Sequence, residues 1–126
     1  MPVIVDTSAW IDYFRSGKNS EKLDFLIDQD LVVINELILA ELVPALRVRN
    51  QKEIIKLLLD IKKLDLSIDW DQIIDFQFKC LKTGINGIGI PDLLVVQNAK
   101  QNRCEIYALD NHFKFMKDVL DLKLSY

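Results

Sequence analysis

Short runs of β-branched and aliphatic residues alternate along the chain with longer segments of helical periodicity. The short runs predict buried strands over 3–5, 31–34 and 104–109, with weaker candidates over 64–68 and 122–124. Apolar residues three and four positions apart predict helices over 8–15, 21–28, 51–63 and 70–82, from Pro91 to 100, and around Glu41. Strands that alternate with helices predict an α/β fold, with a mainly parallel central sheet flanked by helices.

The composition narrows the class of protein. The chain has 126 residues, with no internal repeat and no linker, and we expect one domain over residues 1–126. Its apolar stretches are short and broken by charges, and its first residues lack the pattern of a secretory signal, so we expect a cytoplasmic protein without a membrane span. Cys80 and Cys104 suggest small buried side chains rather than a disulfide framework. A net charge of −3 excludes a polycation, so binding to nucleic acid would need local basic patches.

Four acidic residues stand where a surface carboxylate is not expected. Asp6 and Asp110 each follow a predicted strand, Asp92 opens a largely apolar helix, and Glu41 has apolar neighbours one turn away on either side. Each position also has an ordinary explanation. Asp6 and Asp110 can cap helices, Asp92 is favoured in a first turn, and Glu41 can lie at the edge of its apolar stripe.

The joint pattern of these acids is more informative than any one of them. Carboxyl ends of parallel strands share one edge of a sheet, where α/β proteins bind ligands. Two carboxylates about 4 Å apart repel by roughly 4 kcal/mol at an effective dielectric of about 20, so a converging cluster requires a cation. Oxygen ligands without His or Cys favour Mg²⁺, with Mn²⁺ as a possible substitute, and such a metal serves phosphoryl chemistry. With His112 as its one histidine, the chain excludes zinc sites built from several.

In their order and spacing, the segments VIVDTSAWIDYF, the helix around Glu41, IPDLLVVQNAK and YALDNHF resemble a PIN domain, and within that group the VapC toxins of toxin–antitoxin pairs. The resemblance implies a Mg²⁺-dependent endoribonuclease whose catalytic and metal-binding residues are Asp6, Glu41, Asp92 and Asp110. It also implies an RNA substrate, a small antitoxin partner and a homodimer. Residues that orient metal ligands or substrate would be Thr7, Ser8 and Asn111.

The sequence departs from the family pattern at two positions near the last acid. Ala108 replaces a frequent Thr or Ser, which removes a hydrogen bond to a ligand or water. His112 stands where some members have a further acid, and this weakens the case for a second metal. We interpret His112 as a surface residue in the first turn of its helix, with RNA phosphate as the alternative contact.

Further residues suggest binding surfaces. A basic cluster of Arg47, Arg49 and Lys52 follows the Glu41 helix and predicts a rim that contacts the RNA backbone. The apolar side chains of the first helices, Trp10, Phe14 and Phe25, predict the homodimer contact, and for Trp10 and Phe14 packing in the core or at an interface is favoured over base stacking. We expect the antitoxin to lie as an amphipathic segment between the early helices and to place an Arg on the acidic residues.

Two other functions stay open at this point. One is a catalytically silent PIN-like module that binds RNA or a protein, although the presence of all four acids argues against it. The other is an aspartyl phosphoacceptor or phosphatase with Asp6 as the nucleophile. A dehalogenase-like phosphatase would want a second Asp two residues later, where Ser8 stands.

Overall fold

The computed structural model describes residues 1–125 and contains a parallel four-stranded sheet. Its strands are β1 (Val3–Val5), β2 (Val32–Asn35), β3 (Lys62–Leu64) and β4 (Glu105–Tyr107), in the order β3-β2-β1-β4. Every residue of β1 and β2 is buried, as expected for central strands covered on both faces. The predicted α/β fold with a parallel central sheet is confirmed.

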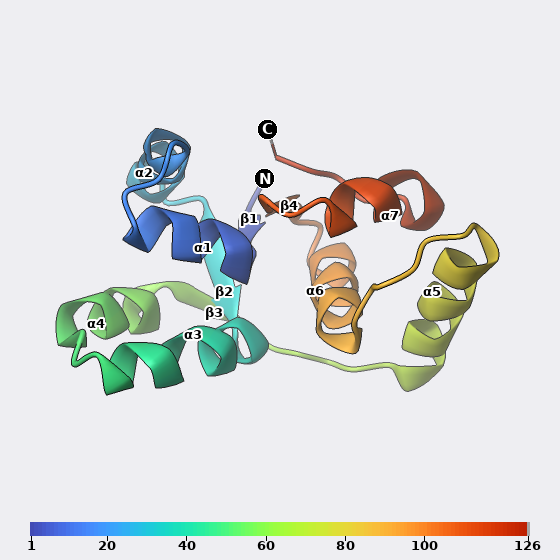
Figure 1. Cartoon of the computed structure of the whole chain (residues 1–126), viewed down its shortest axis with the longest axis horizontal. Helices are drawn as coiled ribbons and strands as arrows, with labels where there is room; N and C mark the ends of the chain where they lie inside the picture. The colour runs from blue at the N-terminus through green and yellow to red at the C-terminus, as the bar shows by residue number, and fades with distance from the viewer. Residues whose placement is uncertain (126) are drawn as a thin grey trace.

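Helices cover both faces of this sheet (Figure 1). The groups α1–α4 and α5–α7 lie on opposite sides of it, and α5 lies at the outer edge of the second group (Figure 1). The helices are α1 (Thr7–Phe14), α2 (Ser20–Asp28), α3 (Glu36–Val48), α4 (Lys52–Asp60), α5 (Trp70–Lys82), α6 (Ile90–Gln101) and α7 (His112–Leu120). Most of these bounds agree with the predicted ranges to within a residue or two, and the range of α5 agrees at both ends.

The segment between α4 and α5 differs from the prediction. The helix predicted over 51–63 ends at Asp60, and the strand predicted over 64–68 lies instead at Lys62–Leu64. The lysines of β3 are exposed because the strand is at the edge of the sheet, where charged side chains discourage pairing with other chains. An exposed charged edge strand carries no apolar run, and helical periodicity therefore extends the predicted helix over Lys62 and Lys63.

Two further expectations need correction. The weak strand predicted over 122–124 is reduced to a single parallel bridge between Ile106 and Leu124. Trp10, counted above among the side chains of a dimer surface, is fully buried, and its ring stacks on that of Phe14 at a centroid distance of 5.8 Å. Trp10 therefore belongs to the core, and of the three aromatic side chains only Phe25 is largely exposed, at 57%.

The two cysteines have the environment expected of them: Cys80 and Cys104 are free and buried, as predicted. None of the helices within residues 1–125 has the length and apolar character needed to cross a membrane.

Candidate functional site at the carboxyl edge of the sheet

Asp6 lies at the point where β1 ends and α1 begins. Its side chain, 6% exposed, caps α1 by accepting hydrogen bonds from the backbone N–H of Ser8 at 3.2 Å and from Ser8 Oγ at 3.0 Å. Ser8 Oγ in turn accepts a hydrogen bond from the backbone N–H of Leu109 at 3.1 Å. Ser8 thereby fixes the carboxylate of Asp6 and ties the end of β1 to the chain that follows β4.

The carboxylate of Asp6 interacts electrostatically with two other predicted site residues. The pKa of Asp6 is raised to about 6, mainly by burial; the two hydrogen bonds from Ser8 oppose this rise, and repulsion from Asp110 and Asp92 contributes to it. Three of the four predicted acids therefore act on one another at this edge of the sheet. A positive charge placed among them would relieve both the burial cost and the repulsion.

Asp92 occupies the first turn of α6, after a loop in which Gly84 and Gly87 adopt φ values of 82° and 80°. Such left-handed conformations carry no steric cost for glycine. The Oδ2 atom of Asp92 lies 3.0 Å from Nδ1 of His112. Burial is the main cause that raises the pKa of Asp92; the hydrogen bond from His112 lowers it, and the charge of Asp110 raises it.

His112 lies in the first turn of α7, as predicted, but it also contacts two predicted site acids. Its side chain is 42% exposed, but its ring contacts Asp92, and its backbone N–H donates to Oδ1 of Asp110 at 3.1 Å. Both groups of His112 thus contact predicted site carboxylates. No local pattern predicts this contact, because Asp92 and His112 are 20 positions apart and meet only in the folded chain.

Glu41 reaches the site from α3. Thr7 Oγ1, next to Asp6, donates a hydrogen bond to Oε1 of Glu41 at 3.1 Å. The expected position of Glu41 on a core-facing stripe is wrong: Ile38 and Leu42 face the core, whereas Glu41 is exposed. The one-residue offset rotates Glu41 by about 100° from the buried line, so its carboxylate remains in solvent.

The remaining predicted residues lie around these acids. Asn111 is the exposed N-cap residue of α7, and its side chain makes no capping hydrogen bond. Arg47, Arg49 and Lys52 are exposed where α3 ends and α4 begins. Arg49 lines a cavity of about 190 Å³ between α1 and α3, which is also lined by Ile11, Phe14, Arg15, Glu41, Leu42, Ala45 and Leu46.

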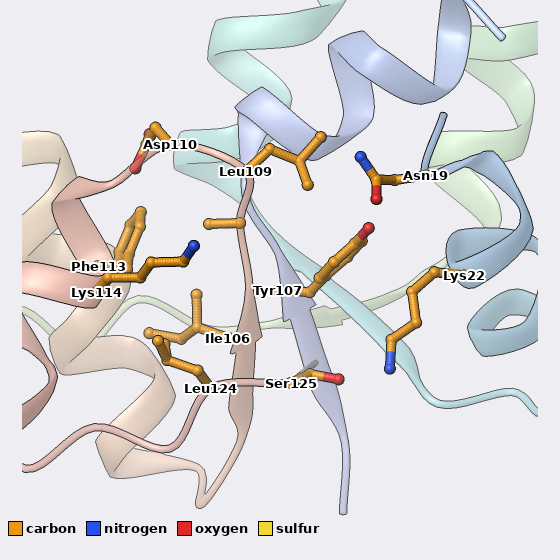
Figure 2. A pocket seen from close by; sticks show the side chains of 11 residues that line it. Asn19, Lys22, Ile106, Tyr107, Leu109, Asp110, Phe113, Lys114, Leu124 and Ser125 are labelled. Atoms are coloured by element: carbon orange, nitrogen blue, oxygen red, sulfur yellow. The ribbon is translucent and has the colours of Figure 1, made fainter. Parts of the chain in front are cut away.

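A second cavity, of about 310 Å³, opens beside β4 between α2 and α7 (Figure 2). Tyr107 and Leu109 form part of its wall, and Asp110 lies at its rim (Figure 2). Lys22 and Lys114 line it from the two flanking helices. The lining of this cavity therefore combines two lysines with one of the predicted site acids.

A divalent metal such as Mg²⁺ needs several oxygen ligands around one point. The oxygen-only carboxylates of the site and their mutual repulsion fit Mg²⁺ or Mn²⁺ in chemistry. In residues 1–125, however, the side chains as placed bring no group of three His, Cys, Asp or Glu together closely enough to enclose one ion. The chemistry of the site therefore fits a metal, while the side chains would have to turn to complete its coordination.

Sequence reasoning missed a set of buried amides beneath the site. Gln97 and Asn98 are buried in α6, at 2% and 1% exposure. Gln97 binds the backbone N–H and C=O of Asp69, at 3.1 and 3.0 Å, and so anchors the start of α5. Two adjacent amides in an otherwise apolar helix are a signal that could have found them, because buried polar groups require partners.

These observations define a class: an α/β protein whose parallel sheet carries a cluster of carboxylates at the carboxyl ends of its strands. The family model described as "PIN domain" matches residues 3–118. The chain belongs to the PIN domain family, whose members are generally nucleases.

Solved structures give the same fold. One similar chain is that of the DNA-bound VapBC from Salmonella typhimurium, with 13% identity, a TM-score of 0.72, and 99% of this chain and 97% of that chain covered. Another is that of VapBC2 from Rickettsia felis bound to a promoter DNA fragment, with 20% identity, a TM-score of 0.74, and 99% of this chain and 98% of that chain covered. FitAcB from Neisseria gonorrhoeae is also similar, with 16% identity, a TM-score of 0.68, and 98% of this chain and 96% of that chain covered. At these identities the likeness concerns the fold. A comparison with curated proteins gives no match.

Proposed function

We propose that this PIN domain, over residues 1–126, is a divalent-metal-dependent endoribonuclease and the toxin of a VapBC-type pair. The observation that carries the proposal is the buried carboxylate of Asp6, whose pKa is raised to about 6 and which interacts electrostatically with Asp92 and Asp110. Perturbed carboxylates grouped at a strand-end edge are typical of functional sites, since a stable fold alone does not require them.

The proposed roles follow from the contacts of each residue. Asp6, Asp92 and Asp110 would hold Mg²⁺, with Mn²⁺ as a substitute, and Glu41 would complete the acidic ring directly or through water. When bound, the metal would activate water and offset the charge that develops on the phosphodiester. Ser8 holds Asp6 in place by two hydrogen bonds, and Thr7 orients Glu41. Asn111, exposed at the start of α7, would contact the substrate.

The surroundings of the acids supply positive charge for RNA. Arg47, Arg49 and Lys52 form an exposed basic rim at the junction of α3 and α4. On the other side of Asp110, the cavity of Figure 2 adds Lys22 and Lys114. We propose that RNA phosphates lie along these groups, since an acidic site needs neighbouring cations to hold a polyanion.

The cavity between α1 and α3 fits the predicted antitoxin. Its walls are apolar at Ile11, Phe14 and Leu46, and its charged lining consists of Arg15, Arg49 and Glu41. An amphipathic segment with acidic side chains toward the two arginines and a basic one toward Glu41 would match this combination. Two of the solved structures similar in fold are of VapBC bound to DNA. An Arg of the partner could reach Asp6, Asp92 or Asp110, because a guanidinium binds carboxylates bidentately.

One observation favours the alternative of a silent PIN-like module that only binds RNA or protein: in the described part of the chain, the carboxylates do not enclose a metal position. Direct metal binding separates the two functions. Calorimetric titration with Mg²⁺ and Mn²⁺ should give binding to the wild-type chain and weak or no binding to Asp6→Asn. RNA binding without metal binding or cleavage would establish the module instead.

The decisive experiment is cleavage of bulk RNA with Mg²⁺ and with a chelator. We expect cleavage by the wild-type chain, none with chelator, and none by Asp6→Asn or Asp92→Asn. A matched control is Asp118→Asn, which removes an exposed carboxylate of α7 outside the site. Full Mg²⁺-dependent activity in either site variant would refute the assignment of the acids.

A further inference from the structure

The cavity of about 310 Å³ beside β4 contains a hydroxyl group that the fold does not use (Figure 2). Tyr107, in the wall of this cavity, is only 6% exposed, and within residues 1–125 its hydroxyl has no hydrogen-bond partner. Polar groups of buried side chains normally have a partner, because leaving them unpaired costs free energy. A ligand held in the cavity could supply the missing partner.

Lys114 adds a cation to the same lining. Its side chain extends from α7 toward β4 (Figure 2), and in the described part of the chain it has no ion-pair partner. Lys22 lines the cavity from the side of α2. These groups favour a ligand that carries both negative charge and hydrogen-bonding atoms.

The rest of the lining is mainly apolar. Its apolar side chains are those of Ile106, Leu109, Phe113 and Leu124, and Ala108 adds only a methyl group to the wall. Cavities that bind small molecules combine such walls with a few polar groups and usually measure about 300–1,000 Å³. A volume of about 310 Å³ lies at the lower end of this range and suits one small, partly apolar ligand.

Asp110 connects this cavity to the acidic site. It follows β4 and lines the cavity, and its charge acts on both Asp6 and Asp92. A chain molecule that runs across these acids and past Asp110 therefore reaches the cavity next.

We propose that the cavity binds one nucleotide of the RNA substrate beside the phosphodiester that is cleaved, with the base against the apolar wall and a phosphate near Lys114. This inference rests on the proposed nuclease function, which supplies RNA as the ligand. A base enters such a cavity once it is unstacked from its neighbours. The Tyr107 hydroxyl can both donate to and accept from the edge of the base, so cleavage would depend on the base at this position.

An NMR titration with each of the four nucleoside 5′-monophosphates, in the presence of a chelator, tests this site without cleavage. The amide signals of Tyr107, Ala108 and Lys114 should shift. Inorganic phosphate and ribose 5-phosphate should bind about tenfold more weakly than the best nucleotide, because they lack a base to cover the apolar wall. Equal affinity for phosphate alone, or the absence of shifts at these residues, would overturn the proposal.

Two substitutions separate ligand binding from stability. Tyr107→Phe removes a hydroxyl without a partner in residues 1–125, so the free energy of unfolding should stay the same, while the Kd of the best nucleotide should rise about fivefold. Lys114→Gln should raise this Kd by a similar factor through loss of the phosphate contact. Lys123→Gln, which replaces an exposed lysine after α7, is the matched control and should have no effect. Wild-type affinity in Tyr107→Phe or in Lys114→Gln would contradict the assignment.

Ala108→Leu replaces a methyl group of the wall by an isobutyl group and should weaken nucleotide binding by about tenfold or more, with circular dichroism showing a folded chain. Sequencing the ends of cleaved bulk RNA gives a second measure. The wild-type chain with Mg²⁺ should prefer one base beside the cut, and Tyr107→Phe should weaken that preference.

The two proposals fail in different ways. Cleavage without any base preference would refute this nucleotide site and leave the nuclease function intact. Absence of cleavage by the wild-type chain would refute the nuclease function, and the titration would still decide whether the cavity binds a nucleotide.

Discussion

The side chain of Asn35, at the end of β2, donates a hydrogen bond from Nδ2 to Oδ1 of Asn98 in α6, at 2.9 Å. Both residues are buried, at 0% and 1% exposure. Oδ1 of Asn35 caps α3 through the N–H of Ile38, and Nδ2 of Asn98 donates to the backbone carbonyl of Asp65. This one amide pair therefore fixes the helix that carries Glu41 relative to the helix that carries Asp92.

Asn98→Ala should lower the free energy of unfolding by about 1–3 kcal/mol, because it leaves Nδ2 of Asn35 buried without a partner. Asn35→Ala should cost as much and about 1 kcal/mol more for the lost helix cap. Urea denaturation measures both effects. The double variant should lose less than the sum of the two single losses, and strict additivity would show that the pair is not energetically linked.

Asp6→Asn should stabilise the metal-free protein at neutral pH. Burial raises the pKa of Asp6 from 3.8 to about 6, so the folded state holds the proton more tightly than the unfolded state. The stability that this proton gives is fully present below pH 3.8 and is lost as the pH rises through about 6. Removing the charge should therefore add about 1–3 kcal/mol above that pH.

Melting curves between pH 4.5 and about 7.5 would measure this effect, with Asp118→Asn as the control for loss of an exposed carboxylate. The advantage of Asp6→Asn should grow with pH. Adding Mg²⁺ should raise the melting temperature of the wild-type chain and not that of Asp6→Asn. An advantage that stayed constant over the pH range would contradict the raised pKa.

His112→Ala should raise the pKa of Asp92. Burial raises this pKa most, and the hydrogen bond and charge of His112 oppose that effect. Without the imidazole, protonated Asp92 should persist to higher pH, and the acidic limb of the activity profile should move in the same direction. Carbon-detected NMR titration of the Asp92 carboxyl group reads the shift directly, with Lys123→Ala, the replacement of an exposed residue that follows α7, as the control. An unchanged titration would show that the His112 contact has no electrostatic effect.

Replacing Arg47, Arg49 and Lys52 together by Gln should weaken RNA binding and its dependence on salt. Each phosphate contact to a single strand contributes about −0.7 to the slope of log K against log [salt], so three lost contacts should flatten it by about 2. Fluorescence anisotropy at several salt concentrations gives this slope.

The matched control for this rim replaces Lys18, Lys62 and Lys123, exposed lysines elsewhere on the chain, by Gln. The net charge then changes by the same amount. An equal flattening of the slope in both triple variants would mean that RNA senses only the overall charge of the protein, with no dedicated rim.

The sequence was sufficient for the fold class and for the positions of Asp6, Asp92 and Asp110 in their elements. Apolar runs identified β1 and β2 because central parallel strands are buried on both faces. Helical periodicity gave both ends of α5 for the same reason, since one of its faces packs on the core. Asp6 and Asp110 could be predicted because a carboxylate after a buried strand is a pattern that a linear chain displays. Asp92 could be predicted because a carboxylate at the start of an apolar helix is equally local.

Tertiary structure alone decided which of these groups touch. Glu41 reaches Thr7, Asn35 reaches Asn98 and His112 reaches Asp92 over 34, 63 and 20 positions of sequence. Such contacts depend on how helices cross and rotate over the sheet, and periodicity fixes that rotation only to about one residue, or about 100°. That uncertainty moved Glu41 from the expected core stripe into solvent. The strand predicted over 64–68 was displaced to β3 for a different reason, because an exposed charged edge strand carries no apolar run. Local sequence patterns reflect burial, whereas the contacts between distant side chains are set by the packing of whole elements.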